Sequence, residues 1–430
     1  MTSDVLPERW PTVTLGSICA DVRYGYTASA TDDPVGPRFL RITDIVGDHV
    51  DWSAVPYCEA SPSDGLKYEL LLGDIVIART GASAGTSHYC RPPEPAVFAS
   101  YLVRFRAEVA RADPRYVSYV LRSPSWWGYV RGASGGSAQP QLNAQVMRGF
   151  SFPLPPVPDQ MRIAAILCAL DDKIDSNRRL AVLLEVTAAT LFPARFVDYV
   201  GVAEFEESES GRIPRGWRMA RIGDLLTVVG GSTPSTTEPR FWNGTHCWAT
   251  PKDLSGARSP ILLDTDRHIT GEGVSRISSN LLPVRTVLLS SRAPVGYTAV
   301  TFVEVAINQG FIAIPPSDGV PSEFVFFWLR EHMDQIKAHA GGTTFAEISK
   351  RQFRPLPMVV PPAERLQEFA SVAAPMFDLM AIHEAEVRTL TELRDALLPK
   401  LISGQICVPD TADPAEVIEP AVEALQAAAP

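Results

Sequence analysis

The sequence predicts an α+β protein made of two related domains, each a mixed sheet with short helices, separated by two long antiparallel coiled-coil helices. Three observations support this fold class. A set of residues recurs in the same order in both halves of the chain, short β-branched runs alternate with turn residues in each half, and a heptad-like apolar pattern follows each of these regions.

The repeat has a period of roughly 206 to 211 residues. The repeated pairs are Trp10 and Trp217, Gly16 and Gly223, Asp44 and Asp253, Gly85 and Gly296, Leu121-Arg122 and Leu329-Arg330, Gly135-Gly136 and Gly341-Gly342, and Pro155-Pro156 and Pro361-Pro362. Two related halves imply a pseudo-two-fold axis, and such a body is suited to a target with approximate two-fold symmetry. Duplex DNA is the leading candidate.

The composition is that of an ordinary globular protein with several cores. The chain has 430 residues, 46% of them hydrophobic, and a net charge of -10, of which residues 355–430 contribute most, with 4 basic against 12 acidic residues. The other segments are close to neutral, so the charge permits DNA binding without supporting it. We find no apolar leader and no charge-free apolar run of about 18 residues, and therefore expect a cytoplasmic protein. The six cysteines are widely spaced, which favours reduced thiols over a disulfide framework or a zinc cage.

Runs of β-branched and aromatic residues bounded by Gly, Pro and Ser predict the strands. In the first half they cover 39–42, 74–78 and 101–105, and in the second half 286–289 and 310–314. A short helix is expected after each set, at about 114–121 and 322–332. The acidic stretch 204–211 is expected to be a solvated linker.

Proline-rich segments end both sheet patterns, and a long helix is expected after each. The first helix is predicted to begin near Asp159, whose side chain can cap the first turn, and both helices are expected to close on Leu-x-Pro, at Pro193 and Pro399. The predicted organisation is a first domain over 1–152, a central helix over 153–200, a second domain over 201–358, a C-terminal helix over 359–409 and a disordered acidic tail over 410–430.

Alternating steps of four and three residues give an apolar seam on each helix. On the first helix the seam comprises Ile163, Leu167, Leu170, Ile174, Asn177, Ala181, Leu184, Ala188 and Leu191. On the second it comprises Phe369, Ala373, Met376, Met380, His383, Val387, Leu390, Arg394 and Leu397. About 35 residues of helix extend roughly 50 Å.

Asn177 and His383 fall near the middle of the two seams. If the helices pack antiparallel, the hypothesis is that these residues lie side by side and fix the register. The alternative is that His383 points sideways to solvent.

Catalytic patterns are weak. Gly81-Ala82-Ser83-Ala84-Gly85 matches the G-x-S-x-G nucleophile elbow, but the second copy, residues 291–296, has no central serine and no helix pattern follows either copy. The histidines lack metal-ligand spacing, so no metal site is expected, and His88, His246 and His268 are expected at surface or loop positions. A methyltransferase tetrad of Asn or Asp, two prolines and an aromatic residue is also absent from the sequence. The chain is therefore expected to be non-catalytic and to carry no cofactor.

Polar loops recur at equivalent places in both halves and form the candidate DNA face. Glycine allows close backbone approach, hydroxyls and backbone amides bind phosphate, and Arg, Lys or Gln can contact base edges. For any single residue an ordinary turn is the simpler interpretation, and only the duplicated set of loops indicates a DNA face. The candidates in the first half are Tyr26, Thr27, Ser29, Arg41, Thr43, Arg79, Thr80, Ser83, Ser137 and Gln139. Those in the second half are Ser232, Thr233, Ser235, Thr250, Lys252, Ser291, Arg292, Thr343 and Thr344.

From about Trp10 to Val408 the chain resembles the specificity (S) subunit of type I restriction-modification enzymes. The resemblance rests on two variable regions that each open on Trp-x-x-x-x-Leu/Ile-Gly, contain Arg-Thr-Gly or Ser-Ser-Arg-Ala-Pro-x-Gly after a strand, and end in Pro-Pro and a long helix. Residues 401–406 (Leu-Ile-Ser-Gly-Gln-Ile) also resemble the usual ending of that family. The second helix opens on Pro-Pro-Ala-Glu-Arg where the first has Pro-Pro-Val-Pro-Asp-Gln, which leaves its starting point open.

The resemblance implies two target recognition domains, each binding one half of a bipartite site in double-stranded DNA, with the helices setting the spacing. It also implies two methyltransferase (modification) subunits docked on the helices, which would supply S-adenosylmethionine and the chemistry, with restriction subunits as further partners. Two alternatives stay open at this stage: a related system with a fused nuclease-methyltransferase partner, and a stand-alone DNA-binding regulator or scaffold.

Overall fold

The computed structural model describes residues 10–46, 50–133, 142–208, 211–292, 294–341 and 346–408. The chain forms two compact units. Unit 1 contains Met1–Lys173 and Thr389–Pro430, and unit 2 contains Ile174–Arg388. Each long helix is therefore divided between the units. The predicted disordered tail, 410–430, lies outside the described residues.

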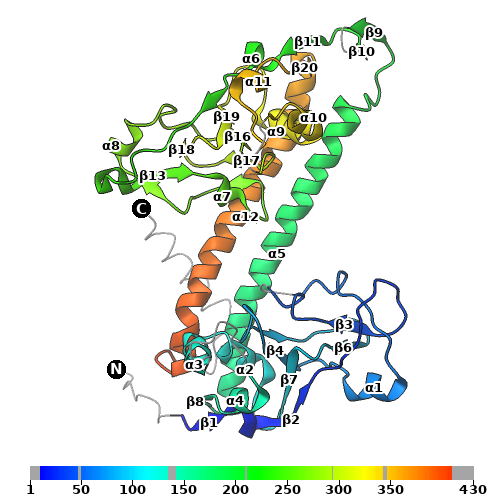
Figure 1. The fold of residues 1–430 in the computed structure, drawn as a ribbon, viewed down its shortest axis with the longest axis vertical. Helices are drawn as coiled ribbons and strands as arrows, with labels where there is room; N and C mark the ends of the chain where they lie inside the picture. Colours follow the sequence, from blue (N-terminus) through cyan, green and yellow to red (C-terminus); the bar gives the residue numbers. More distant parts are fainter. Residues whose placement is uncertain are drawn as a thin grey trace. The chain divides into compact units, whose positions relative to one another are not determined.

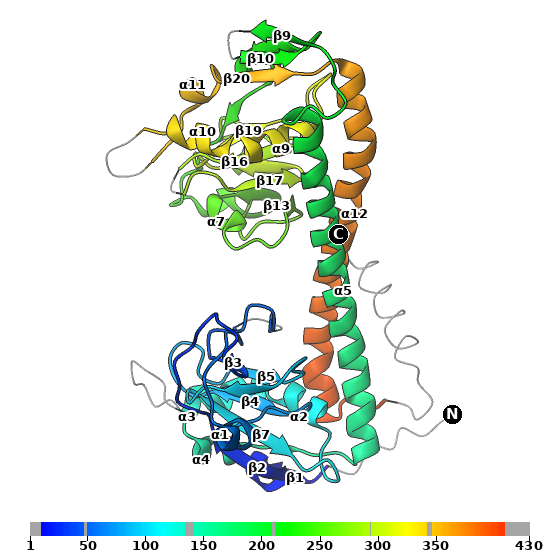
Figure 2. The ribbon, with the colours of Figure 1, turned by 90° about the vertical axis from the view of Figure 1, so that its right-hand side faces the viewer.

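Unit 1 is built on a four-stranded antiparallel sheet of order β2-β7-β4-β5 (Figure 2). Its strands are β2 (Cys19–Tyr24), β7 (Leu102–Ala107), β4 (Ile75–Ala78) and β5 (Ser87–Tyr89), with the pairs β3 (Arg38–Leu40) with β6 (Ala96–Phe98) and β1 (Thr12–Thr14) with β8 (Ser151–Pro153) beside it. Its helices are the 3-10 turn η1 (Leu15–Ile18), α1 (Pro62–Lys67), α2 (Pro114–Val120), α3 (Pro124–Ala133) and α4 (Ala144–Arg148).

Unit 2 has a five-stranded sheet of order β12-β19-β16-β17-β14 and a three-stranded sheet of order β15-β13-β18. The five-stranded sheet contains β12 (Val229–Gly230), β19 (Phe311–Ile314), β16 (Val287–Ser290), β17 (Thr298–Thr301) and β14 (Ile261–Leu262), and the three-stranded sheet contains β15 (His268–Ile269), β13 (Trp242–Ala249) and β18 (Val305–Ile307). A further pair joins β11 (Arg218–Arg221) to β20 (Pro357–Val360), and the helices are α6 (Ile222–Leu225), η2 (Pro239–Phe241), α7 (Pro251–Leu254), α8 (Gly271–Val274), α9 (Ser322–Glu331), α10 (Met333–Ala338) and α11 (Lys350–Phe353).

The two domains share a core topology, as the sequence repeat predicts, and unit 2 adds β14 to one sheet and β15 to the other. In both domains an outer antiparallel strand pair, β1 with β8 or β11 with β20, joins the start of the domain to the segment before the long helix. Strands β7 and β19 each have an antiparallel neighbour on both sides. A parallel strand pair lies next to each of these sheets. The parallel pairs are β3 with β6 and β13 with β18. The predicted strands and short helices are all present, with ends shifted by one or two residues. The predicted linker is in part a hairpin of β9 (Phe205–Ser208) and β10 (Gly211–Pro214), which is exposed at 206–207 and 211–212 and buried at 213–214.

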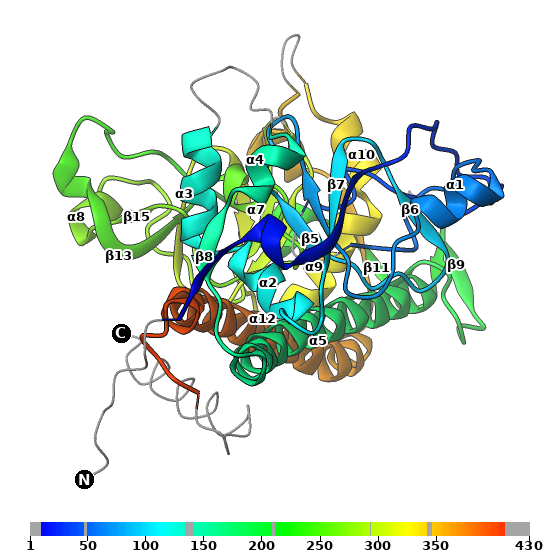
Figure 3. The ribbon, with the colours of Figure 1, turned by 90° about the horizontal axis from the view of Figure 1, so that it is seen from below.

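The long helices are α5 (Val157–Phe196) and α12 (Ala363–Ser403). Within unit 1 the start of α5 lies beside the end of α12 (Figures 1 and 3), and within unit 2 the end of α5 lies beside the start of α12. The helices are antiparallel in each unit. Helix α5 begins two residues before the predicted Asp159. The predicted Leu-x-Pro endings were wrong, because both helices continue past their prolines, to Phe196 and Ser403.

Most but not all of the predicted seam is buried on the two long helices. The buried seam residues are Ile163, Leu167, Leu170, Ile174, Asn177, Ala181, Ala188, Phe369, Ala373, Met380, Val387, Leu390 and Arg394. Leu184, Leu191, Met376, His383 and Leu397 are only half-buried, whereas the neighbouring Phe192, Phe377 and Leu398 are buried. A straight α-helix has 3.6 residues per turn, so a strict 3.5-residue pattern drifts off the contact face.

The predicted polar pair of the seam lies within unit 2. Asn177 is fully buried, and neither its Oδ1 nor its Nδ2 has a hydrogen-bond partner, nor does the buried Nδ1 of His383. A direct bond through these atoms does not join the two residues. That they lie side by side stays a prediction.

In unit 1, hydrogen bonds to Asp171 of α5 join the sheet domain to the two long helices. The carboxylate accepts hydrogen bonds from Tyr119 Oη, Arg122 Nη1 and Arg394 Nη1, each at 2.8 Å. Burial alone would raise the pKa of the Asp171 carboxyl, but the two guanidinium groups and the phenol outweigh burial and lower that pKa. Burial and the neighbouring carboxylate raise the pKa of Tyr119.

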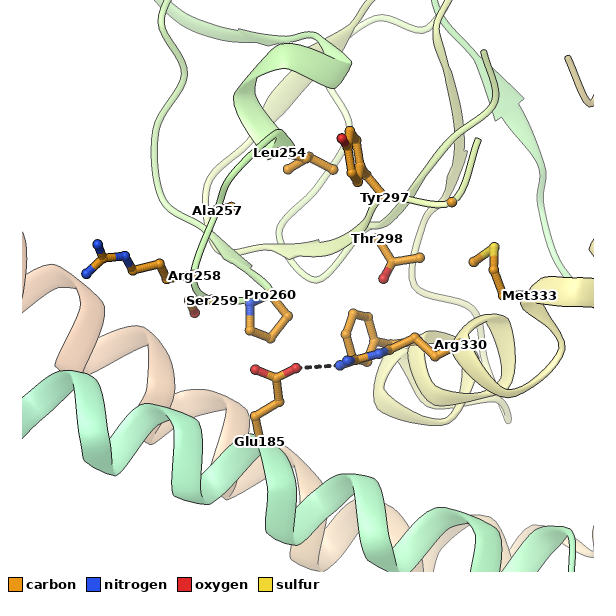
Figure 4. A pocket seen from close by; sticks show the side chains of 12 residues that line it. Glu185, Leu254, Ala257, Arg258, Ser259, Pro260, Tyr297, Thr298, Arg330 and Met333 are labelled. Carbon is orange, nitrogen blue, oxygen red and sulfur yellow. Dashed lines mark hydrogen bonds and ion pairs between the residues drawn. The ribbon is translucent and has the colours of Figure 1, made fainter. Parts of the chain in front are cut away.

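Unit 2 uses a different contact at the equivalent helix. Arg330 of α9, the repeat partner of Arg122, pairs with Glu185 of α5. Figure 4 shows the two side chains pointing toward each other at the edge of a cavity of about 330 Å³, which is lined by Pro260, Thr298 and Met333 among others. Two further ion pairs of unit 2, Arg285 with Asp378 and Arg388 with Asp264, join its sheet domain to α12.

Candidate nucleic-acid interface

The predicted DNA-contacting loops follow strands that end at one edge of each domain. In the first domain β2 and β4 are both antiparallel to β7, so their carboxyl ends lie at the same edge. In the second domain β12 and β16 are both antiparallel to β19. The loops after these strands carry Tyr26, Arg79, Ser232 and Arg292. The topology therefore brings together residues that are 50 or more positions apart in the sequence.

Backbone hydrogen bonds to the segment 98–101 join the loops of the first domain. The amide of Tyr26 donates to the Phe98 carbonyl at 2.7 Å, and the amide of Ala99 donates to the Leu40 carbonyl at 2.8 Å. The amide of Arg79 donates to the Tyr101 carbonyl at 3.0 Å. The loops after β2, β3 and β4 are thus held by one segment, which we call hub 1 (98–101).

The second domain repeats these bonds around residues 307–310, which we call hub 2. The amide of Ser232 donates to the Ile307 carbonyl at 3.1 Å, and the amide of Asn308 donates to the Ala249 carbonyl at 3.0 Å. The amide of Ser291 donates to the Gly310 carbonyl at 2.8 Å. Backbone groups make these bonds, so loops that carry different side chains can share the same scaffold.

A glycine lies against each hub at the equivalent position. A Cβ atom on Gly25 would lie 2.1 Å from the Ala99 carbonyl oxygen, and one on Gly231 would lie 1.9 Å from the Ile307 carbonyl oxygen. Both distances are far below van der Waals contact, so only glycine fits where the first loop crosses the hub.

The candidate side chains of the first domain differ in how they are held. The guanidinium of Arg79 lies 5.1 Å from the ring centre of the exposed Tyr24, and within the described residues it has no carboxylate at ion-pair distance. Arg41 makes two hydrogen bonds to the Asp44 carboxylate, which raise its pKa. Thr27, Ser29 and Thr43 are exposed, whereas Tyr26, Thr80 and Ser83 are half-buried.

The second domain holds its candidates through other contacts. Thr250 precedes α7, and both its backbone amide and its hydroxyl donate to the Asp253 carboxylate at 2.7 Å. Lys252 pairs with Asp266 at 2.9 Å. Arg292 pairs with Glu347 at 3.0 Å. Ser232 Oγ accepts from the Ser278 amide, Ser235 bonds to Thr237, and Ser291 is buried.

Some candidates lie outside the described residues, and others emerge only from the structure. Ser137, Gln139, Thr343 and Thr344 fall in 134–141 and 342–345, which the structure does not describe. The sequence analysis missed Tyr101 of hub 1, which is exposed, and Gln309 of hub 2, whose Oε1 accepts a hydrogen bond from Thr233 at 2.6 Å. Both lie in the segment directly before β7 or β19, and the recurrence of that segment in the two halves was the signal available.

The hydrolase-like motif does not form a nucleophile elbow. Such an elbow is a tight turn from a strand into a helix. Strand β5 follows Gly85, and β17 follows Gly296. The three histidines expected at surface or loop positions lie in strands and are partly exposed: His88 in β5, His246 in β13 and His268 in β15.

Two domains of one topology, each presenting duplicated polar loops at one sheet edge and each joined to a long helix, define a bipartite recognition protein. The chain belongs to the family described as type I restriction modification DNA specificity domain, whose model matches residues 64–186 and 214–392. It is a DNA-recognition subunit of that class.

Individual relatives agree with this assignment. The MjaIX specificity subunit of a type I restriction enzyme from Methanocaldococcus jannaschii is 36% identical over 179 residues, which cover 41% of each chain. A second chain of that organism, provisionally described as the MjaX specificity subunit of a type I restriction enzyme, is 24% identical over 94% of this chain and 95% of its own length. The crystal structure of a type I restriction-modification system S subunit from M. genitalium has a TM-score of 0.59 at 12% identity and covers 94% of this chain and 98% of its own. That structure supports the fold.

Among the described residues, no helix is both long and apolar enough to span a lipid bilayer.

Proposed function

We propose that each domain of this chain binds one half of a bipartite DNA site and that the polar loops around hub 1 and hub 2 make the contacts. The observation that supports this most is the duplicated set of backbone hydrogen bonds, which holds three loops at one edge in both domains while their side chains differ. Backbone-held loops with variable side chains suit recognition of two different half-site sequences.

The proposed contacts divide by chemistry. Exposed hydroxyls such as Thr27 and Ser29, and the backbone amides beside them, would bind phosphate oxygens. Arg79 and Arg292 are suited to base edges or phosphate, because a guanidinium presents a fork of donors. The ion pairs of Arg292 and Arg41 keep these side chains oriented until DNA competes for them.

We also propose that α5 and α12 set the distance between the half-sites and dock two methyltransferase subunits, which bind S-adenosylmethionine and transfer the methyl group. Restriction subunits would join that assembly. Each helix has about 40 residues, or roughly 60 Å of α-helix, which exceeds one turn of B-DNA at about 34 Å.

The test changes the helices and leaves the loops alone. Seven residues, about two turns, would be inserted into both α5 and α12 at matching places, and the partner methyltransferase would be expressed with each variant. We expect methylome sequencing to recover both original half-sites with a changed gap between them. An unchanged gap in an active variant would contradict the spacing role, and retained half-sites would still support recognition by the loops.

The matched control removes Glu207 and Arg212, an exposed register pair of the hairpin β9–β10 between the first helix and the second domain, and keeps the buried Ile213. It alters chain length without altering either helix, so the gap should stay as in the parent protein.

A further inference from the structure

Three side chains of the types that bind transition metals converge in unit 2, on the three-stranded sheet. Asp264 Oδ1 lies 2.9 Å from His268 Nε2, and Cys247 Sγ lies 3.6 Å from Asp264 Oδ1 and 3.8 Å from His268 Nε2. All three donor atoms lie within 4.8 Å of one another. Donors at zinc-ligand distances of about 2.0 to 2.3 Å in a tetrahedral site are roughly 3.3 to 3.6 Å apart, so small side-chain adjustments would bring this triangle to that size.

The backbone positions the side chains of Cys247, Asp264 and His268. Cys247 of β13 and His268 of β15 are register partners in an antiparallel ladder, so their side chains project from the same face. The Thr265 amide donates to Asp264 Oδ1 at 2.8 Å, and the Thr265 hydroxyl accepts from the Trp248 amide at 3.0 Å. These bonds hold the loop between β14 and β15 against β13.

Asp264 also has the outer contact that ligating carboxylates commonly have. Arg388 of α12 pairs with its second oxygen, Oδ2, at 2.7 Å and leaves Oδ1 directed at the cysteine and the histidine. Hydrogen bonds of this kind orient metal ligands. The side chains of Asp264 and His268 are about one third exposed, so an ion can enter from solvent.

The geometry does not fit a cysteine nucleophile. In a catalytic relay the histidine uses one ring nitrogen for the nucleophile and the other for the carboxylate. Here Cys247 and Asp264 both approach Nε2 of His268, so the three donor atoms surround one point and do not lie in series.

The first domain fills the equivalent position differently. Cys247 pairs with Val305 in the parallel ladder of β13 and β18, as Arg38 pairs with Ala96 in that of β3 and β6. The Arg38 guanidinium lies 4.0 Å from the Tyr57 ring centre, donates to the Val55 carbonyl at 2.6 Å and pairs with Glu94 at 2.5 Å. In the first domain a permanent cation, the Arg38 guanidinium, therefore occupies this position. The second domain has side chains that can bind a cation at the equivalent position.

We propose that Cys247, Asp264 and His268 form a zinc site that cross-links β13, the loop before β15 and, through Arg388, helix α12. Thiolate, imidazole and carboxylate are the ligands that zinc takes in proteins, and three of them leave the fourth position to water or to a ligand from a partner. The site does not depend on the proposed DNA contacts.

The experiment uses tag-free full-length chain, stripped with a chelator and given one equivalent of zinc before dialysis. Metal analysis should find one zinc per chain in the parent protein, and competition with a chromophoric chelator should show at least about a 10-fold loss of affinity in Cys247→Ser and His268→Gln. Cys407→Ser and His246→Gln are the matched controls, since Cys407 lies outside unit 2 and His246, next to Cys247 in β13, projects from the opposite face of the strand. Both variants should bind zinc as the parent does. Circular dichroism of the metal-free proteins checks that each variant folds.

A second readout needs no variant. Cobalt added to the metal-free parent should give a thiolate-to-cobalt charge-transfer band in the near ultraviolet and the visible bands of tetrahedral cobalt. No cobalt band and no retained zinc in the parent protein would overturn the proposal, as would zinc retained equally by Cys247→Ser and the parent.

Discussion

The two domains share a backbone scaffold but differ in the side chains mounted on it. In the first, Arg79 stacks near Tyr24 and Arg41 is held by Asp44; in the second, Thr250 occupies the position of Arg41 and Arg292 is held by Glu347. The backbone bonds around the two hubs match one for one. Backbone atoms make the scaffold and side-chain atoms make the candidate contacts, so one architecture can carry two different sets of contact residues.

The largest effect is expected from the glycines at the hubs. Gly25→Ala and Gly231→Ala force a Cβ into a backbone carbonyl, and each should lower the free energy of unfolding of its own domain by about 3 kcal/mol or more. Urea unfolding followed by circular dichroism measures the loss. Gly65→Ala and Gly271→Ala are controls, because nothing lies within 4 Å of the added atom. If the hub variants unfolded like these controls, the shared scaffold would not depend on a close approach at the hub.

A smaller loss of stability is expected at the contacts that join each sheet domain to α5. Asp171→Asn removes the charge that Arg122 and Arg394 share, and should cost about 1.5 to 3 kcal/mol at neutral pH, more than Glu185→Gln in unit 2. Because the pKa of Asp171 is lowered in the folded protein, its contribution to stability is complete above its ordinary pKa near 4 and disappears as the pH falls through the lowered value.

Thermal unfolding from pH 7 to pH 2.5 tests this. The difference between parent and Asp171→Asn should shrink as the pH falls below about 4. A difference independent of pH would mean that the variant acts through packing instead of charge.

The smallest expected effect is a gain in stability at the helix seam. Asn177 buries an amide without a hydrogen-bond partner, so Asn177→Leu should stabilise unit 2 by about 1 kcal/mol, whereas the half-buried His383→Leu should change little. Calorimetry measures both. A loss of stability in Asn177→Leu would indicate a partner for the amide, and would support the predicted pairing across the seam.

Most of the architecture could be predicted from the sequence because it is repeated. An interpretation of one copy can be checked against the other. The second copy, 291–296, lacks the central serine and a strand follows both loops, so a hydrolase elbow is excluded. Strands such as 74–78 and helices such as 114–121 were predicted because their apolar runs and turn residues are local signals. The helix ends were not, because a proline near a helix end can be tolerated when tertiary packing supports the helix, as Phe192 and Phe196 do around Pro193.

The arrangement of the candidate site was predictable only in part. The loops could be found from their polarity and their recurrence, but the hubs could not, because a hydrogen bond such as that from Arg79 to Tyr101 depends on strand order. The convergence of Cys247, Asp264 and His268 was missed for the same reason: the ladder of β13 and β15 brings together residues 21 positions apart, a spacing that matches no metal motif.

The most direct test of the account is site selection by the complex carrying Arg79→Ala, compared with Arg292→Ala and the parent protein. We predict that Arg79→Ala relaxes sequence preference in one half-site and Arg292→Ala in the other, with a lost bidentate base contact costing about 1 to 3 kcal/mol of discrimination. Equal relaxation of both half-sites by either variant would contradict the claim that each domain recognises its own half of the DNA site.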